Sequence, residues 1–123
     1  MDRRGLGVIG EEAALRHLRA GGYRIRDRNV RCPMGELDVV AEQGGTIVFV
    51  EVKTRTTADF GAPFDAITPA KRRRLWRLAT YYLITRRLGD RPCRFDAVSV
   101  LVTPQGRVVR VEVLAGAFEV DDT

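Results

Sequence analysis

Two carboxylates and a lysine lie in adjacent segments that both have the composition of β-strands. Asp38 lies in ELDVVAE at residues 36–42, and Glu51 and Lys53 lie in TIVFVEVK at residues 46–53. Carboxylate and carbonyl oxygens are the ligands that Mg²⁺ and Mn²⁺ prefer. A lysine beside such a cation can handle a proton or stabilise developing negative charge. If the fold brings the three residues together, they can form a divalent-cation site with acid–base chemistry.

The segment Gln43-Gly44-Gly45 predicts a hairpin turn between these two strands. Antiparallel pairing across this turn places Asp38 near Val50 and next to Glu51. The side-chain face of Asp38 depends on this register, because a one-residue shift or a bulge moves a side chain to the other side of the sheet. With that register, Asp38, Glu51 and Lys53 are expected at one end of the sheet.

The strand at residues 46–53 is apolar on both faces, so we expect it in the middle of the sheet, covered on both sides. Glu51 and Lys53 share one face and lie about 7 Å apart at a rise of roughly 3.3 Å per residue. On the preceding strand, Asp38 is expected on one face and three apolar residues on the other: Leu37, Val39 and Ala41. The alternative for Glu51 and Lys53 is a partly hydrated ion pair that contributes little to stability.

A glutamate on the predicted helix at residues 5–20 lies on the apolar side of that helix. Glu11 is at helical spacing from three apolar residues, Ala14, Leu15 and Leu18. Its neighbour Glu12 aligns with two arginines instead, as a solvated acid would. An acid near a helix N-terminus also complements the helix dipole, but this does not explain why Glu11 faces leucines. Glu11 is therefore a further candidate for the site.

The second predicted helix carries much of the positive charge. Thr68 is a preferred N-cap, Pro69 takes the first helical position, and the helix runs to about Arg87. The segment from residue 66 to residue 89 contains no acid and seven basic residues: Lys71, Arg72, Arg73, Arg74, Arg77, Arg86 and Arg87.

Four of these residues are candidates for contacts with nucleic-acid phosphates: Lys71, Arg73, Arg74 and Arg77. Helical spacing places Arg73 and Arg77 opposite the apolar stripe and Arg74 to one side. Lys71 projects from near that stripe and is expected to reach the end of the sheet. The alternative is a solvated face whose charges are balanced by neighbouring elements, and the absence of acids within the helix counts against it.

Length and composition restrict the class of protein. The chain has 123 residues, a net charge of +5 and 45% hydrophobic residues, which indicates one globular domain and a polyanionic partner. One histidine and two distant cysteines, Cys32 and Cys93, exclude a zinc site and indicate reduced thiols. We see neither a secretory signal nor the roughly 20 apolar residues of a membrane span, so we expect a cytoplasmic protein that does not bind membranes.

Further strands are predicted at residues 23–30, 94–102 and 107–113, with the first at an edge. The order of elements is therefore αβββαββ, which indicates the α/β class. We expect a single domain over residues 1–118 and a mobile tail over residues 119–123.

Taken together, these segments resemble the YraN family of small bacterial proteins. The resemblance rests on GEEAALRHL, GGYRIRDRNVR, GELDVVA, VFVEVKTR, FGAP, Lys71 and RFDAVSV in this order, and it covers about Gly7 to Phe118. That family is assigned to the PD-(D/E)xK nuclease superfamily and is compared with archaeal Holliday junction resolvases. The resemblance implies a restriction-endonuclease-like core with a mixed central sheet flanked by helices.

The resemblance also implies roles for individual residues. Asp38 matches the acid of the superfamily pattern, Glu51 and Lys53 match its E-x-K, and Glu11 matches the upstream glutamate. Lys71 matches a family lysine to which we assign no role. We expect Asp38 and Glu51 to bind Mg²⁺ or Mn²⁺, with the Val52 carbonyl and with Glu11 acting through water, while Lys53 orients the attacking water.

The expected function is that of a metal-dependent, endonuclease-like phosphodiesterase acting on DNA. Branched or flapped DNA, and a homodimer that cuts two strands, follow by analogy with the resolvases. One alternative is a non-catalytic nucleic-acid-binding module that retains the nuclease fold. Another is an adaptor whose acidic residues form salt bridges with Lys53 and Lys71.

Overall fold

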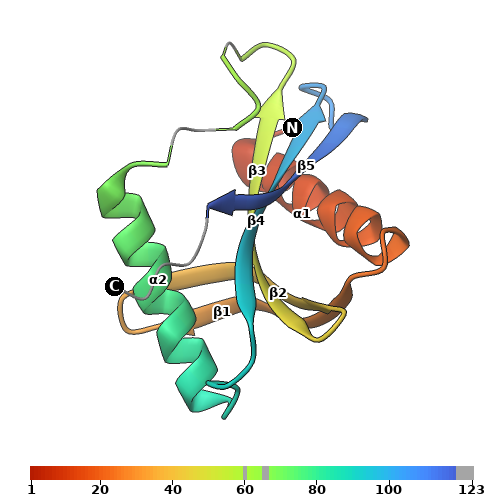
Figure 1. Ribbon diagram of the computed structural model, residues 1–123. Coiled ribbons are helices and arrows are strands. Elements are labelled where there is room, and N and C mark those ends of the chain that lie inside the picture. The colour runs from red at the N-terminus through yellow and green to blue at the C-terminus, as the bar shows by residue number, and fades with distance from the viewer. Residues whose placement is uncertain (60, 65–66, 119–123) are drawn as a thin grey trace.

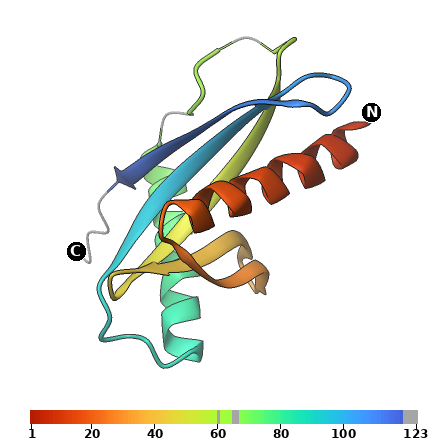
Figure 2. The ribbon, with the colours of Figure 1, turned by 90° about the vertical axis from the view of Figure 1, so that its right-hand side faces the viewer.

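A computed structural model describes residues 1–59, 61–64 and 67–118. It shows a five-stranded sheet with a helix on each face (Figures 1 and 2). In chain order the elements are α1 (Arg3–Ala20), β1 (Arg24–Cys32), β2 (Gly35–Gln43), β3 (Thr46–Thr56), α2 (Pro69–Thr85), β4 (Cys93–Val102) and β5 (Val108–Phe118). The predicted α/β class and the order αβββαββ are confirmed, and a mixed sheet between helices is what a restriction-endonuclease-like core requires. Phe60 of the FGAP segment and the predicted tail at residues 119–123 lie outside the described residues.

β3 lies in the middle of the sheet, whose order is β1-β2-β3-β4-β5. It pairs antiparallel with β2 and parallel with β4, and the outer pairs β1–β2 and β4–β5 are antiparallel. α2 connects the two parallel strands, because a parallel pair needs a long crossover connection. The predictions of a central strand at residues 46–53 and an edge strand at residues 23–30 are both confirmed.

Alternate residues of β3 pack into two separate apolar cores. Val48 and Val50 pack on the side of α1, together with Leu15 and Leu18. Phe49 packs on the side of α2, where its ring meets the ring of Tyr82 edge-on at 5.9 Å. Because both cores depend on β3, burial on both sides holds the strand segment that carries the candidate residues.

The two predicted helices form, with small differences at their ends. Asp2 caps α1, which begins at Arg3 rather than at residue 5. The Thr68 hydroxyl accepts the Lys71 amide N–H at 3.1 Å, as the predicted N-cap requires, and α2 ends at Thr85 rather than Arg87. Among the described residues, neither helix is long and apolar enough to cross a membrane.

The turn between β2 and β3 is the predicted one, but the register differs by one residue. Gly44 and Gly45 have φ values of 57° and 84°, the left-handed values of a type I′ hairpin turn. Val39, rather than Asp38, lies opposite Val50. In this register Asp38 lies opposite Glu51, one residue pair beyond Val39 and Val50, where the regular pairing of β2 with β3 ends.

The predicted alternation of β2 is wrong at the start of the strand. Val39 packs on the α1 side, as Ala41 does, whereas Leu37 packs on the α2 side. On the neighbouring strand β1, Asn29 lies between the residues that pair with Val39 and Leu37, and its φ is 53°. Both strands are therefore irregular at the level of Asp38, and simple alternation does not predict which face each side chain takes.

β5 is longer than the sequence predicts. Its register with β4 shifts next to Asp96, and Gly116 adopts a φ of 62°. The Gly116 amide N–H donates to the buried Asp96 carboxylate at 2.9 Å. This side-chain acceptor keeps the segment after Val113 attached to β4, although its sequence lacks the alternation of a strand.

α1 crosses β3 at a glycine. A Cβ atom on Gly10 would lie 1.9 Å from Thr54 Oγ1, which is far inside van der Waals contact. The absence of a side chain at Gly10 therefore lets α1 approach β3 closely, and it sets how deeply the next residue, Glu11, lies against the sheet.

We expect Gly10→Ala to destabilise the protein by about 1–3 kcal/mol, because the added methyl group must push α1 away from β3. Gly7→Ala is the matched control in the same helix, since a Cβ there meets no atom within 4 Å. Because alanine favours the helix more than glycine does, Gly7→Ala should stabilise the protein by roughly 0.5–1 kcal/mol. Urea unfolding measures both changes, and equal stability of the two variants would contradict the close approach at Gly10.

Candidate metal and nucleic-acid site

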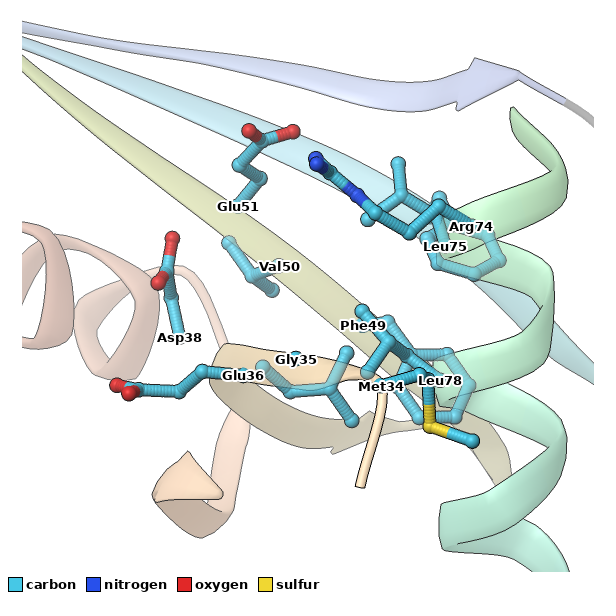
Figure 3. Close-up of a pocket in the computed structure, with 12 residues that line it drawn as sticks. Met34, Gly35, Glu36, Asp38, Phe49, Val50, Glu51, Arg74, Leu75 and Leu78 are labelled. Carbon is cyan, nitrogen blue, oxygen red and sulfur yellow. The ribbon is translucent and has the colours of Figure 1, made fainter. Parts of the chain in front are cut away.

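The site forms where a side chain continues the pairing of β2 with β3. The Val52 amide N–H donates to Asp38 Oδ2 at 2.8 Å. The last recorded backbone pair of this ladder is Val39 with Val50, so the Asp38 carboxylate takes the place of the next backbone acceptor. This bond holds Asp38 beside the segment of β3 that carries Glu51, and Figure 3 shows the two carboxylates on their neighbouring strands.

Glu51 is paired with a lysine from α2. Lys71 Nζ lies 3.1 Å from Glu51 Oε1, and the lysine side chain is only 20% exposed. The prediction that Lys71 reaches the sheet rather than bulk solvent is confirmed. Lys53 lies two residues beyond Glu51 and lines, with Glu51 and Lys71, a small cavity of about 40 Å³. Glu51 is therefore the carboxylate around which the basic residues of the site gather.

Glu11 approaches the site from α1. It is half-buried, and its Oε1 atom is buried without a hydrogen-bond partner among the described residues. Ala14, Leu15 and Leu18 of the same helix are fully buried, as the predicted apolar stripe requires. Glu12 lies elsewhere on the surface and pairs with Arg28 at 2.7 Å. A buried carboxylate oxygen without a hydrogen-bond partner is costly, so a donor or a cation placed beside Glu11 would be favourable.

Four carboxylates influence one another at this point of the sheet. Burial raises the pKa of Asp38, and the charges of Glu51, Glu11 and Glu36 raise it further. The Val52 amide opposes these effects by hydrogen bonding to the charged form and lowering the pKa of Asp38. The net shift is upward, so the fold disfavours the negative charge on Asp38 and would favour a cation beside it.

Asp38 and Glu51 open onto a cavity of about 250 Å³ (Figure 3). Glu36 and Arg74 also line this cavity, and both are exposed residues. The rest of its lining is largely apolar and comes from β2, β3, β4 and α2: Leu37, Phe49, Val50, Leu75, Leu78 and Phe95. Glu36 was not among the residues predicted for the site, and its position two residues before Asp38 on the same strand is the one sequence signal that could have suggested it.

The basic candidates on α2 divide into two groups. Arg73 and Arg77 are exposed, as predicted for residues opposite the apolar stripe. Arg74 is exposed as well but lines the cavity between α2 and the sheet. None of the three forms an ion pair with any described residue, so their charges remain available for a polyanion. The alternative of a basic face balanced by neighbouring acids therefore does not hold for these three residues.

The donor set fits a hard divalent cation, although the donors are not grouped as in a formed metal site. Among the described residues, no three His, Cys, Asp or Glu side chains are close enough together to hold a metal ion. Asp38 and Glu51 nevertheless line one cavity, and the buried Glu11 oxygen has no hydrogen-bond partner among the described residues. All three are oxygen donors of the kind that Mg²⁺ and Mn²⁺ take. Glu51 would have to exchange Lys71 for the cation.

Comparisons with known proteins give one consistent family. The family described as "Uncharacterised protein family UPF0102" matches residues 10–100, a segment that contains every candidate site residue. A UPF0102 protein of Moorella thermoacetica is 54% identical over 118 residues, which cover 96% of this chain and 98% of that protein. A UPF0102 protein of Symbiobacterium thermophilum is 52% identical over 120 residues, with 96% and 98% covered.

Among solved structures, that of Pyrococcus furiosus SfsA in complex with Ca²⁺ is similar to this chain. The TM-score is 0.41 and the sequence identity 16%, and the match covers 94% of this chain and 64% of that chain.

We expect Asp38→Asn to be more stable than the wild type at neutral pH and to lose this advantage in acid. Because the fold raises the pKa of Asp38, the folded wild type binds the proton more tightly than the unfolded chain does. The free energy of unfolding of the wild type therefore falls as the pH rises through the raised pKa of Asp38. Asparagine keeps an acceptor for the Val52 amide without the charge. Urea unfolding midpoints from acid to neutral pH test this expectation.

Glu12→Gln is the control for this pH series, with the opposite sign. The ion pair and hydrogen bond with Arg28 lower the pKa of Glu12, so any stability that this group contributes is present at neutral pH and lost in acid. A difference between wild type and Asp38→Asn that stays constant with pH would contradict a raised pKa of Asp38.

Proposed function

The chain belongs to the protein family UPF0102, and from the geometry of its carboxylate site we propose that it is a metal-dependent phosphodiesterase that cleaves DNA. One observation carries the proposal. Asp38 and Glu51 line a single cavity where the β2–β3 ladder ends, beside a third carboxylate, Glu11, whose buried oxygen has no hydrogen-bond partner in the part of the chain that the structure describes. A structural role alone would not favour so many acids around one strand end, because their charges raise the pKa of Asp38.

The proposed ligands are the side chains of Asp38 and Glu51 and the Val52 carbonyl, with Glu11 acting through water. A Mg²⁺ or Mn²⁺ ion held there would lower the pKa of a bound water and polarise the phosphodiester. Lys53 lies two residues from Glu51 on the same strand and lines the adjoining small cavity. In the proposal its ammonium group orients the attacking water and stabilises the negative charge that develops on the phosphate.

Lys71 is proposed as the counter-ion of Glu51 when no divalent cation is bound. Its ammonium group lies 3.1 Å from the Glu51 carboxylate, in a largely buried position. Removing one partner of such a pair leaves the other charge uncompensated. A bound cation can take over this compensation, and the released lysine can then face a phosphate.

The proposed substrate is DNA held by its backbone. Arg73, Arg74 and Arg77 follow one another along α2, and Arg74 also lines the cavity that Asp38 and Glu51 share. Arginine contacts to phosphates position a strand without reading its sequence. Branched or flapped DNA is proposed by analogy with the resolvases, and a homodimer would supply one site for each strand of a junction.

A non-catalytic nucleic-acid-binding module is the second candidate function. The observation that favours it is the ion pair between Lys71 and Glu51, since an ammonium group already neutralises a proposed metal ligand. In this reading the arginines of α2 bind the backbone and the carboxylates serve only the fold.

We expect wild-type protein to cleave at least one of four labelled substrates, namely single-stranded, duplex, flapped and four-way-junction DNA, with Mg²⁺ or Mn²⁺ and not with EDTA. Lys53→Ala should lower the cleavage rate by about 100-fold or more, because a positioned acid–base or charged group contributes on this order. Arg107→Ala, an exposed arginine in the β4–β5 turn, is the control that keeps activity. Binding without cleavage on all four substrates would favour the second candidate.

We also expect Mn²⁺ to raise the melting temperature of the wild type, because a ligand that binds only the folded state stabilises it. Asp38→Asn should abolish this shift, and Glu12→Gln should keep it, since Glu12 pairs with Arg28 away from the site. Differential scanning calorimetry with and without Mn²⁺ measures the effect. No shift in the wild type at millimolar Mn²⁺ would favour the adaptor reading, in which the acids only form salt bridges.

A further inference from the structure

A hollow on the α2 side of the sheet is lined by three arginines from two elements. Arg24, Arg26 and Arg86 surround a volume of about 310 Å³ together with Ile25 and Asp27. It lies between β1 and the C-terminal end of α2, two elements that run close to each other (Figure 1). Its lining shares no residue with the cavity of Figure 3. The hollow is therefore a separate feature from the carboxylate site.

A β-bulge in β1 creates this cluster. Ile25 pairs with Ala41 and Asp27 pairs with Val40, so Arg26 is the extra residue between them. Beyond the bulge, Arg28 faces α1 and pairs with Glu12, whereas Asp27 accepts a hydrogen bond from the Tyr82 hydroxyl of α2 at 2.6 Å. Arg26 also lies against that hydroxyl. The bulge thus turns two consecutive charged residues toward α2, which is how bulges redirect side chains.

Arg26 carries an unsatisfied donor in this hollow. Its Nε atom is buried and has no hydrogen-bond partner among the described residues. The Glu42 carboxylate lies 3.8 Å from Nη1, another nitrogen of Arg26. A buried N–H of a cation without an acceptor is rare in folded proteins and is costly, so a ligand that supplies an acceptor would be favoured there.

The acids beside the hollow are already engaged. Glu42 pairs with both Arg24 and Arg91. Asp27 accepts the Tyr82 hydroxyl and lies 3.7 Å from Arg86. Four arginines therefore share two carboxylates, and the hollow keeps a positive charge that suits an anion.

We propose that the hollow binds one backbone phosphate of a nucleic-acid strand whose neighbouring segment lies at the carboxylate site, and this inference rests on the proposed function. The planar guanidinium group matches phosphate oxygens better than any other cationic side chain. A phosphate in the hollow would pair with the partly exposed guanidinium group of Arg26, with Arg86 contributing from the end of α2. The ligand chemistry is a phosphate monoanion or diester, and its two sources are free phosphate and a nucleic-acid backbone.

The distance between the two places indicates which phosphate is bound. Glu42, next to the hollow, lies four positions after Asp38 on β2, or about 13 Å at the rise of a strand. This separation corresponds to about four nucleotides of one strand at 3.4 Å per nucleotide. Along α2, Arg74 at the cavity and Arg86 at the hollow lie twelve positions apart, or about 18 Å at the rise of a helix, so a strand that follows α2 would span about five nucleotides.

The first test follows the arginine Nε–H groups by NMR during a titration with inorganic phosphate. We expect the Arg26 signal to shift and saturate, and the signal of exposed Arg107 to stay unchanged. Sodium chloride at equal ionic strength should not reproduce the shift. Equal movement of both signals, or no movement of the Arg26 signal, would overturn the anion site.

The second test distinguishes the two sources of phosphate. Short single-stranded DNAs, each with one neutral methylphosphonate at a different position, are bound to wild type, Arg26→Met, Arg86→Met and the control Arg107→Met in EDTA. A methylphosphonate at one position of the DNA should weaken binding to the wild type by about tenfold. The same DNA should bind Arg26→Met as tightly as the unmodified DNA does. The slope of log affinity against log salt should fall by about 0.7 in Arg26→Met. Arg86→Met repeats the experiment at an exposed position, should Arg26→Met not fold.

The outcomes separate this inference from the proposed function. Phosphate binding at Arg26 with no coupling to any backbone position would overturn the nucleic-acid assignment and leave a site for free phosphate. Coupling at one position supports the inference even if no substrate is cleaved, because the binding measurements use no metal. Cleavage of DNA with no coupling supports the phosphodiesterase and overturns the hollow as part of its strand path.

Discussion

The hydrogen bond from the Val52 amide to the Asp38 carboxylate is the interaction on which the candidate site depends. It replaces a backbone pair at the end of the β2–β3 ladder, so a charged side chain is held between strands that would otherwise leave no room for one. An amide donor stabilises the ionised carboxylate, which lets an acid remain at a buried position. The end of the regular pairing also uncovers Glu51 of β3 and the cavity beside it, because β2 places no regularly paired residue opposite Glu51.

Charge balance explains why elements distant in the sequence meet at this opening. Carboxylates from β2, β3 and α1 raise the pKa of Asp38, and within the described residues Glu51 is the one of them that has a defined ion pair, to Lys71. Glu11 reaches the sheet because Gly10 allows α1 to approach Thr54. The site is therefore short of positive charge, whereas the arginines of α2 and the hollow beside β1 provide an excess of it nearby. A phosphodiester with a divalent cation would satisfy both needs at once.

The sequence predicted the elements better than it predicted the contacts between them. The N-cap of α2, the hairpin turn between β2 and β3 and the central position of β3 follow from local rules, and the structure has all three, whereas the N-cap of α1 at Asp2 was not predicted. The register of the hairpin and the face of Leu37 could not be predicted, because they depend on the Asp38 side chain, which accepts the Val52 amide in place of a backbone carbonyl. The length of β5 depends in the same way on the Asp96 side chain, which accepts the Gly116 amide. Glu11 and Lys71 were found because helical spacing is regular. The position of Arg26 was missed because the bulge in β1 breaks the alternation on which strand predictions rest.

The parallel pairing of β3 with β4 has a consequence for the order in which the chain folds. β1, β2 and β3 are joined by short connections and can form an antiparallel meander from local contacts. Ile47 meets Cys93 only after α2 has crossed over, and closing such a long loop costs entropy before its contacts are made. The acids of β2 and β3 can therefore come together before Lys71 arrives to neutralise Glu51. Their repulsion in that early meander would slow its formation, and a divalent cation or a lower pH during refolding would relieve it.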